Sequence, residues 1–174
     1  MVNLKETAMA PEIYVTIQLD SFYQGFLRSY FNCRDEVFSF PRGEDLSYRL
    51  VRLLKKPPQE YVPEKRCSCS FDITIPKYDD KDPYSFNYLS EVAERIFIEN
   101  IIRFYLMIFH ESMNKYLKEG FEKKQCFDIF IDQYDLPIDC IDRITKDYQR
   151  YVKRKLNQKY RKKTPSKSPV LSGI

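Results

Sequence analysis

Apolar residues dominate residues 89–117, and the polar residues among them recur every three or four positions. This spacing matches the 3.6-residue turn of an α-helix. The polar positions are Glu91, Arg95, Glu99, Arg103, His110 or Glu111, Asn114 and Lys118. A helix with one narrow polar stripe has to be covered by other elements on its remaining sides. We therefore expect a long central helix that begins after Ser85 or Asn87 and ends at Gly120, where glycine enters the left-handed conformation without steric cost.

Shorter patterns precede this helix. Alternating apolar residues at 13–19 predict a half-buried strand, and Asp20 or Ser21 then caps a short helix over residues 22–31. Residues 37–40 predict a second, short strand, and residues 45–56 a helix capped by Asp45. In residues 67–75 the alternation places Cys67 and Cys69 on the apolar face of a third strand. We expect the first and third strands to pair antiparallel in a small sheet packed on the long helix.

After Gly120 the pattern predicts a helix over residues 122–134, a turn at 135–137, and a last helix capped by Asp139. Residues 164–174 are rich in Ser and Pro, a composition typical of a disordered tail. The predicted fold class is therefore α+β: a small antiparallel sheet on a long central helix, a C-terminal helical hairpin at 121–163 and a basic tail. We expect one domain over residues 1–163.

The positive charge is concentrated near the C-terminus. Residues 143–163 carry ten Lys or Arg and a single acid, Asp147, a local balance of +9. Because the whole chain carries +4, the remainder has a net charge of −5. A cationic arm on a mildly acidic body indicates a polyanionic partner.

Residues 126–150 resemble helix-turn-helix DNA-binding proteins. In that motif apolar residues lock two short helices around a tight turn, and Phe130, Tyr134, Leu136, Ile141 and Ile144 have the required spacing. Two positions depart from it, because Ile131 stands where the first helix usually has a small residue and Asp135 where the turn usually has glycine. Asp139 and Asp142 also make the front of the second helix acidic, which disfavours phosphate contact there.

The basic residues that follow favour contact with phosphates over recognition of base edges. The predicted nucleic-acid contacts are Arg143, Lys146, Arg150, Lys153, Arg154, Lys155, Lys159, Arg161 and Lys162. The leading hypothesis is a non-enzymatic, cytoplasmic DNA-binding protein, regulatory or replication-associated, from a bacterium, phage or mobile element. The source follows from the Trp-free composition rich in Lys, Ile and Tyr. The alternative is a structural or adaptor protein that acts through protein–protein contacts or homo-oligomerisation. DNA is a better candidate than RNA, and we expect no membrane and no small-molecule substrate.

Other chemistry has weaker support. Five cysteines without an apolar leader predict free thiols in a reducing compartment, and Cys67 and Cys69 lack the second pair of ligands that a structural zinc site needs. His110 is the single histidine, and a hydrogen-bonded structural role is the expectation for it. A metal-dependent nuclease would require Asp79, Asp80 or Asp82 to approach another carboxylate such as Asp72. With four scattered glycines and no phosphate-binding loop, we expect no cofactor and no bound metal.

Overall fold

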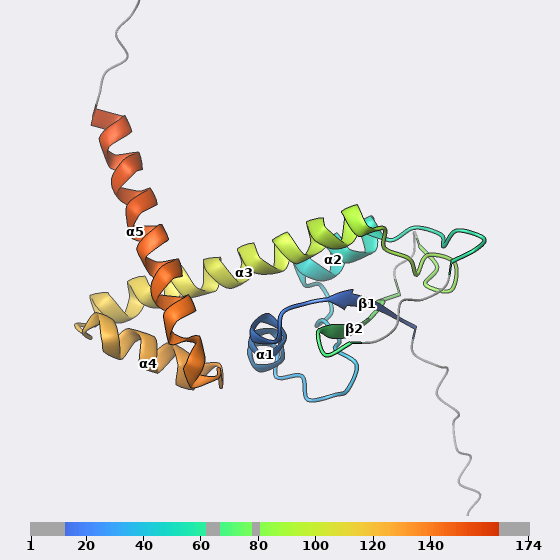
Figure 1. Ribbon diagram of the computed structural model, residues 1–174, viewed down its shortest axis with the longest axis horizontal. Coiled ribbons are helices and arrows are strands. Elements are labelled where there is room, and N and C mark those ends of the chain that lie inside the picture. Colours follow the sequence, from blue (N-terminus) through green and yellow to red (C-terminus); the bar gives the residue numbers. More distant parts are fainter. Residues whose placement is uncertain (1–12, 62–66, 78–80, 164–174) are drawn as a thin grey trace, which may run out of the picture.

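The computed structural model describes residues 13–61, 67–77 and 81–163, and their side chains as far as residue 158. The fold is α+β, as the sequence predicts, and a long helix runs through its centre (Figure 1). In chain order the elements are β1 (Tyr14–Gln18), α1 (Ser21–Tyr30), α2 (Asp45–Leu53), β2 (Ser70–Thr74), α3 (Glu91–Lys118), α4 (Lys123–Gln133), a 3-10 turn η1 (Ile138–Cys140) and α5 (Ile141–Lys163).

The sheet has the predicted antiparallel pairing. Within it Val15 lies opposite Ile73, and Ile17 lies opposite Phe71. The end of β1 is tied to the long helix, because the Gln18 backbone N–H donates to Glu94 Oε1 of α3 at 2.6 Å. The predicted strand at 37–40 is reduced to one isolated bridge between Phe38 and Ile73, so pairing extends for a single residue there.

The start of β2 corrects the prediction for residues 67–75. The strand begins at Ser70, and a turn of residues 67–70 precedes it, closed by a 3.0 Å hydrogen bond from Ser70 N to Cys67 O. Cys67 is exposed and Cys69 is half-buried, so these two thiols are not part of the core. The alternating pattern continued through the turn, and this continuation made the predicted strand too long.

Helix α2 also differs in its ends from the prediction. It starts one position after Glu44, which takes the N-cap position in place of Asp45, and it stops at Leu53. Lys55 then pairs with Tyr88 in an antiparallel bridge, which takes the chain out of the helix before Pro57. Leu46, Leu50 and Leu54 are buried, and Leu53 is half-buried against the same core.

The long helix α3 begins later than expected, at Glu91, because Ser90 caps it by accepting from Ala93 N at 3.4 Å. Its buried side repeats every four residues: Ala93, Phe97, Ile101, Tyr105, Phe109 and Met113. The exposed stripe is wider than predicted, because Val92, Ile96 and Met107 lie on it at 44–56% exposure. The predicted end is confirmed, with Gly120 in the left-handed region at φ +94°.

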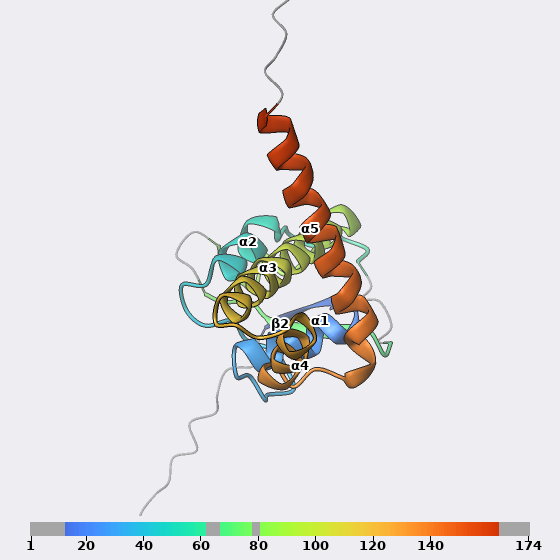
Figure 2. The ribbon, with the colours of Figure 1, turned by 90° about the vertical axis from the view of Figure 1, so that its left-hand side faces the viewer.

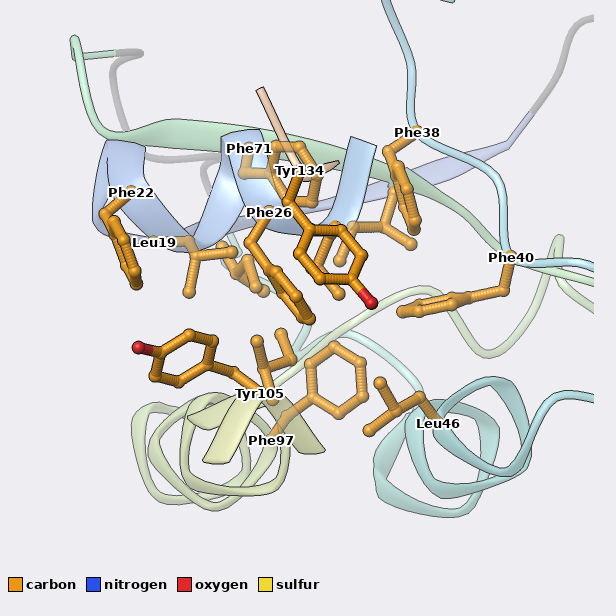
Figure 3. Close-up of a cluster of buried hydrophobic side chains, with 14 of the residues drawn as sticks. Leu19, Phe22, Phe26, Phe38, Phe40, Leu46, Phe71, Phe97, Tyr105 and Tyr134 are labelled. Atoms are coloured by element: carbon orange, nitrogen blue, oxygen red, sulfur yellow. The ribbon is translucent and has the colours of Figure 1, made fainter. Parts of the chain in front are cut away.

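Aromatic rings fill the space between α3 and the elements packed against it. Figure 3 shows Phe26 pointing from α1 toward Tyr105 of α3, and their ring centroids are 5.2 Å apart in an edge-to-face arrangement. Phe97 of α3 and Leu46 of α2 line the same core from below (Figure 3). Each buried aromatic removes a large apolar area from water, so this cluster dominates the stability of the fold.

The C-terminal hairpin packs on the far end of α3. Glu122 starts α4, with its backbone N–H bonded to Gln125 Oε1 at 2.9 Å, and the turn places Asp135 in the left-handed region at φ +46°. Asp139 lies inside the 3-10 turn and does not cap α5 as predicted. Figures 1 and 2 show α5 crossing α3 and extending well beyond the body. Within the described residues, every helix is too short or too polar to cross a membrane.

Candidate nucleic-acid interface

The first turn of α5 is attached to the start of α1. Arg143 donates two hydrogen bonds to the Asp20 carboxylate, at 2.9 and 2.8 Å, and its guanidinium lies 4.8 Å from the centre of the Phe22 ring. The Arg143 side chain lowers the pKa of Asp20 below its ordinary value through these hydrogen bonds. Arg143 is thus engaged within the chain and fixes the direction of α5.

A second attachment holds the middle of α5 against α3. The Tyr151 ring stacks on His110 with centroids 3.8 Å apart, and Asn114 Nδ2 donates to the Tyr151 hydroxyl at 2.8 Å. Lys155 Nζ donates to Asn114 Oδ1 at 3.3 Å. Lys155 is the last described residue of α5 that hydrogen-bonds to another element, and all residues from 152 to 158 are exposed. The helix therefore leaves the body just after this contact.

A cavity of about 150 Å³ opens between the two attachments. Its polar lining consists of Tyr23, His110, Asp147, Arg150, Tyr151 and Arg154. Asp147 is 9% exposed, and burial raises its pKa, although Arg150 Nη1 donates to its carboxylate at 3.1 Å. A polar cavity of this size has room for a few water molecules. Two arginines at its rim give it a positive edge.

His110 is neutral in this environment at pH 7. Burial, and then the charges of Arg154 and Lys155, lower its pKa to about 4, and its Nε2 atom has no hydrogen-bond partner among the described residues. The unfolded chain protonates this histidine near pH 6.5. Between about pH 6.5 and pH 4 the unfolded state therefore binds more protons, and the free energy of unfolding falls as the pH falls.

Because the His110 ring is partly open to solvent, which screens these charges, we expect this effect to reach about 1–2 kcal/mol at pH 4.5 relative to pH 7. Urea unfolding across this pH range measures it, with His110→Phe as the control, because phenylalanine keeps a ring against Tyr151 and cannot titrate. Asp147 faces the same cavity, and we expect its contribution to the pH dependence of unfolding to be the same in the wild type and in His110→Phe. Equal pH dependence in the two proteins would contradict the buried, neutral state of His110.

The structure brings five of the predicted contact residues to one side of α5. At about 100° per residue, Arg143, Lys146, Arg150, Lys153 and Arg154 fall within roughly a third of the helix circumference. Lys155 lies on the other side, against Tyr151, with its Nζ 4.5 Å from the ring centre. The side chains of Lys159, Arg161 and Lys162 lie outside the described residues, although the helical backbone continues to Lys163.

The interior of the predicted helix-turn-helix is buried. Phe130, Tyr134, Leu136 and Ile144 belong to the core, and Ile141 packs against it. Asp139 and Asp142 are exposed at the front of α5, as the sequence indicated. In a helix-turn-helix the front of the second helix approaches the DNA. Here that end is acidic and bound to α1 through Arg143, whereas the exposed cations lie further along.

The acidic residues considered for metal binding are hydrogen-bonded within the sheet or a turn, or lie outside the described residues. Asp72 accepts from Thr16 Oγ1 at 2.6 Å, and Asp82 accepts from Ser85 Oγ at 3.0 Å. Asp79 and Asp80 lie outside the described part of the chain. Within residues 13–61, 67–77 and 81–163, no three His, Cys, Asp or Glu side chains come together as a metal site.

Two pairings in this region were not predicted from the sequence. Arg143 and Asp20 are separated by 123 positions, so no local pattern connects them. Asp147 stood out as the single acid in a basic run, and its spacing of three residues from Arg150 was the available signal for a local ion pair. Comparison of the chain with protein-family models, curated proteins and solved structures finds no match.

Proposed function

We propose that this chain is a non-enzymatic DNA-binding protein that holds the phosphate backbone along one face of α5. The observation that carries this proposal is the combination of position and charge. Lys146, Lys153 and Arg154 are exposed on the side of a helix that extends away from the body (Figure 1). Arg150 lies between them, and its side chain is 68% exposed despite its contact with Asp147.

The contacts within the chain divide the predicted basic residues into two groups. Arg143 and Lys155 position α5, because each is bonded to a residue of another helix or its cap. Lys146, Arg150, Lys153 and Arg154 are the described residues proposed to face phosphates. Lys159, Arg161 and Lys162 extend the same arm in the sequence. A clamp that contacts phosphates and few bases binds with little dependence on sequence.

DNA fits the shape of this arm better than duplex RNA. An isolated α-helix is about 10–12 Å wide, close to the width of the B-DNA major groove, whereas the major groove of A-form RNA is too narrow for side chains to enter. The net charge of −5 outside residues 143–163 repels the backbone elsewhere, which favours docking through α5 alone. A regulatory or replication-associated role in a bacterium, phage or mobile element fits such binding.

The test replaces Lys146, Lys153 and Arg154 together by glutamine. We expect affinity for a labelled duplex to fall about 30-fold at 0.1 M salt, and the salt slope to decrease by up to about 2.7, or 0.9 for each lost phosphate contact. Fluorescence anisotropy across a salt series measures both quantities. All three residues are exposed, so the free energy of unfolding should change by less than about 1 kcal/mol.

The matched control removes the same charge from the other end of the molecule, with Arg42, Arg52 and Arg95 replaced by glutamine. These three side chains are exposed and lie near α2 and the start of α3. The control should keep nearly the full affinity. If both triple variants lose affinity equally, net charge governs binding, and α5 is not the binding face.

Exposed apolar residues favour a second candidate, an adaptor that forms oligomers through α5. Val152 and Leu156 are 36% and 50% exposed, lie four positions apart, and face away from the basic side. They suit pairing with the same helix of a second copy. Sedimentation of the wild-type chain and of Val152→Ser/Leu156→Ser distinguishes this candidate. A dimer that dissociates in the variant, with no DNA binding by either protein, would favour it.

A further inference from the structure

The turn before β2 holds two thiols side by side. Residues 67–70 form a tight turn that is closed twice, by Ser70 N donating to Cys67 O at 3.0 Å and by Cys67 N donating to Ser70 Oγ at 2.9 Å. The backbone N–H of Leu19 also donates to Cys69 O at 2.9 Å, which fixes the turn against the end of β1. The positions of Cys67 and Cys69 are therefore set by the backbone.

The two sulfur atoms are in direct contact. Cys67 Sγ lies 2.7 Å from Cys69 Sγ, and Gln18 Oε1 lies 2.9 and 3.1 Å from them. Two trans peptide steps of about 3.8 Å allow a Cα separation of up to about 7.6 Å, and the turn at residues 67–70 shortens it toward the roughly 4.4–6.8 Å that a disulfide spans. Because Gln18 Oε1 can accept a hydrogen bond from either thiol, it stabilises the thiol that remains protonated when the other ionises.

The two cysteines differ in acidity and access. Cys69 lowers the pKa of Cys67, through its thiol first and then through its backbone N–H, and the Ser70 hydroxyl adds to this effect. The hydrogen bond to Cys67, followed by burial, raises the pKa of Cys69. Cys67 is also the exposed member of the pair. A thiol attacks a disulfide as its thiolate, so Cys67 is the better nucleophile of the two.

We propose that Cys67 and Cys69 form a redox-active dithiol that exchanges with a low-molecular-weight disulfide such as glutathione disulfide. The Cys67 thiolate attacks one sulfur of the disulfide, whose S–S bond breaks and releases one thiolate that takes up a proton. Cys69 then loses its proton and attacks Cys67 Sγ, which forms the Cys67–Cys69 bond and releases the second small thiol. The protein dithiol is oxidised, and the small disulfide is reduced to two thiols.

The other cysteines give the contrast that the test needs. Burial raises the pKa values of Cys126 and Cys140, and both thiols are buried. Cys33 is half-buried and is the best internal reference. At pH 7 we expect Cys67 to react about tenfold faster than Cys33, because Cys69 lowers the pKa of Cys67 and Cys67 is the more accessible thiol.

The experiment treats the reduced full chain with excess glutathione disulfide, quenches samples with acid, alkylates free thiols and analyses tryptic peptides by mass spectrometry. Cleavage after Arg66 and Lys77 places Cys67 and Cys69 in one peptide. We expect this peptide to escape alkylation and to weigh two hydrogen atoms less than its unalkylated reduced form, without a lasting glutathione adduct. Cys69→Ser should keep one glutathione on Cys67, and Cys33→Ser should behave like the wild type.

Several results would overturn the proposal. In the first, the wild-type peptide with Cys67 and Cys69 stays reduced while Cys33 reacts with glutathione disulfide. In the second, this peptide keeps a glutathione adduct and forms no Cys67–Cys69 bond. In the third, glutathione adds to Cys67 of the Cys69→Ser variant no faster than it adds to Cys33. The wild-type peptide alone decides the first two, so the test does not depend on the folding of a variant.

Discussion

Ending the chain after Leu156 is expected to weaken binding to duplex DNA by about 100-fold at 0.1 M salt. The free energy of unfolding should stay within about 0.5 kcal/mol of the wild-type value. The cut removes five cations, at Lys159, Arg161, Lys162, Lys163 and Lys167. It leaves the Tyr151 stack on His110 and the Lys155 bond to Asn114 intact.

The structure shows where the chain can be cut so that DNA affinity changes and the free energy of unfolding does not. A cut before Tyr151 would remove the contacts that hold α5 on α3, and a loss of binding would then have two explanations. A second chain that ends after Lys163 is the matched control, because it lacks the tail but loses only Lys167. It should bind almost as tightly as the full chain. The proposed arm is incorrect if the chain that ends after Leu156 binds equally well.

Replacing Phe130 by alanine should cost about 3–5 kcal/mol of unfolding free energy. Phe130 is completely buried, and its ring centre lies 4.8 Å from that of Tyr134, 5.1 Å from that of Phe109 and 6.4 Å from that of Phe26. It therefore joins α4 to both α3 and α1. A loss of this size is a large fraction of the 5–15 kcal/mol that typically stabilises a domain.

Urea unfolding followed by circular dichroism measures this cost. Phe121→Ala is the control, because Phe121 is 41% exposed at the start of the same hairpin, and the change should cost less than about 1 kcal/mol. Similar, small losses in both variants would mean that α4 does not pack on the aromatic core.

Local periodicity was sufficient to predict most of the elements. The alternation in β1, the helical periodicity of α3 and the glycine at its end depend on neighbouring residues, and the structure confirms this strand, this helix and its end. Element ends were less predictable. Phe38 carries a strand-like pattern but pairs for one residue, because the extent of pairing depends on its partner Ile73, 35 positions away.

At the candidate interface, too, features that depend on nearby residues were predictable and contacts between distant residues were not. The basic face of α5 follows from residue spacing alone, so Lys146, Lys153 and Arg154 could be selected from the sequence. The sequence could not show which cations already bind residues of the chain itself. Arg143 binds Asp20 and Lys155 binds Asn114, and both partners are distant in the sequence. The contact between Cys67 and Cys69 was missed for a related reason. The apolar alternation favoured a strand, whereas hydrogen bonds to Ser70 and Leu19 hold these residues in a turn.

The salt dependence of duplex binding by the full chain tests the central claim most directly. Anisotropy of a labelled duplex should give a logarithm of affinity that falls linearly with the logarithm of salt concentration. The slope should be at least about 3 in magnitude, because four exposed cations of α5 at about 0.9 each give about 3.6 before the cations after Leu156 are counted. No binding at the lowest salt concentration, or an affinity that does not change with salt, would contradict α5 as a phosphate-binding helix.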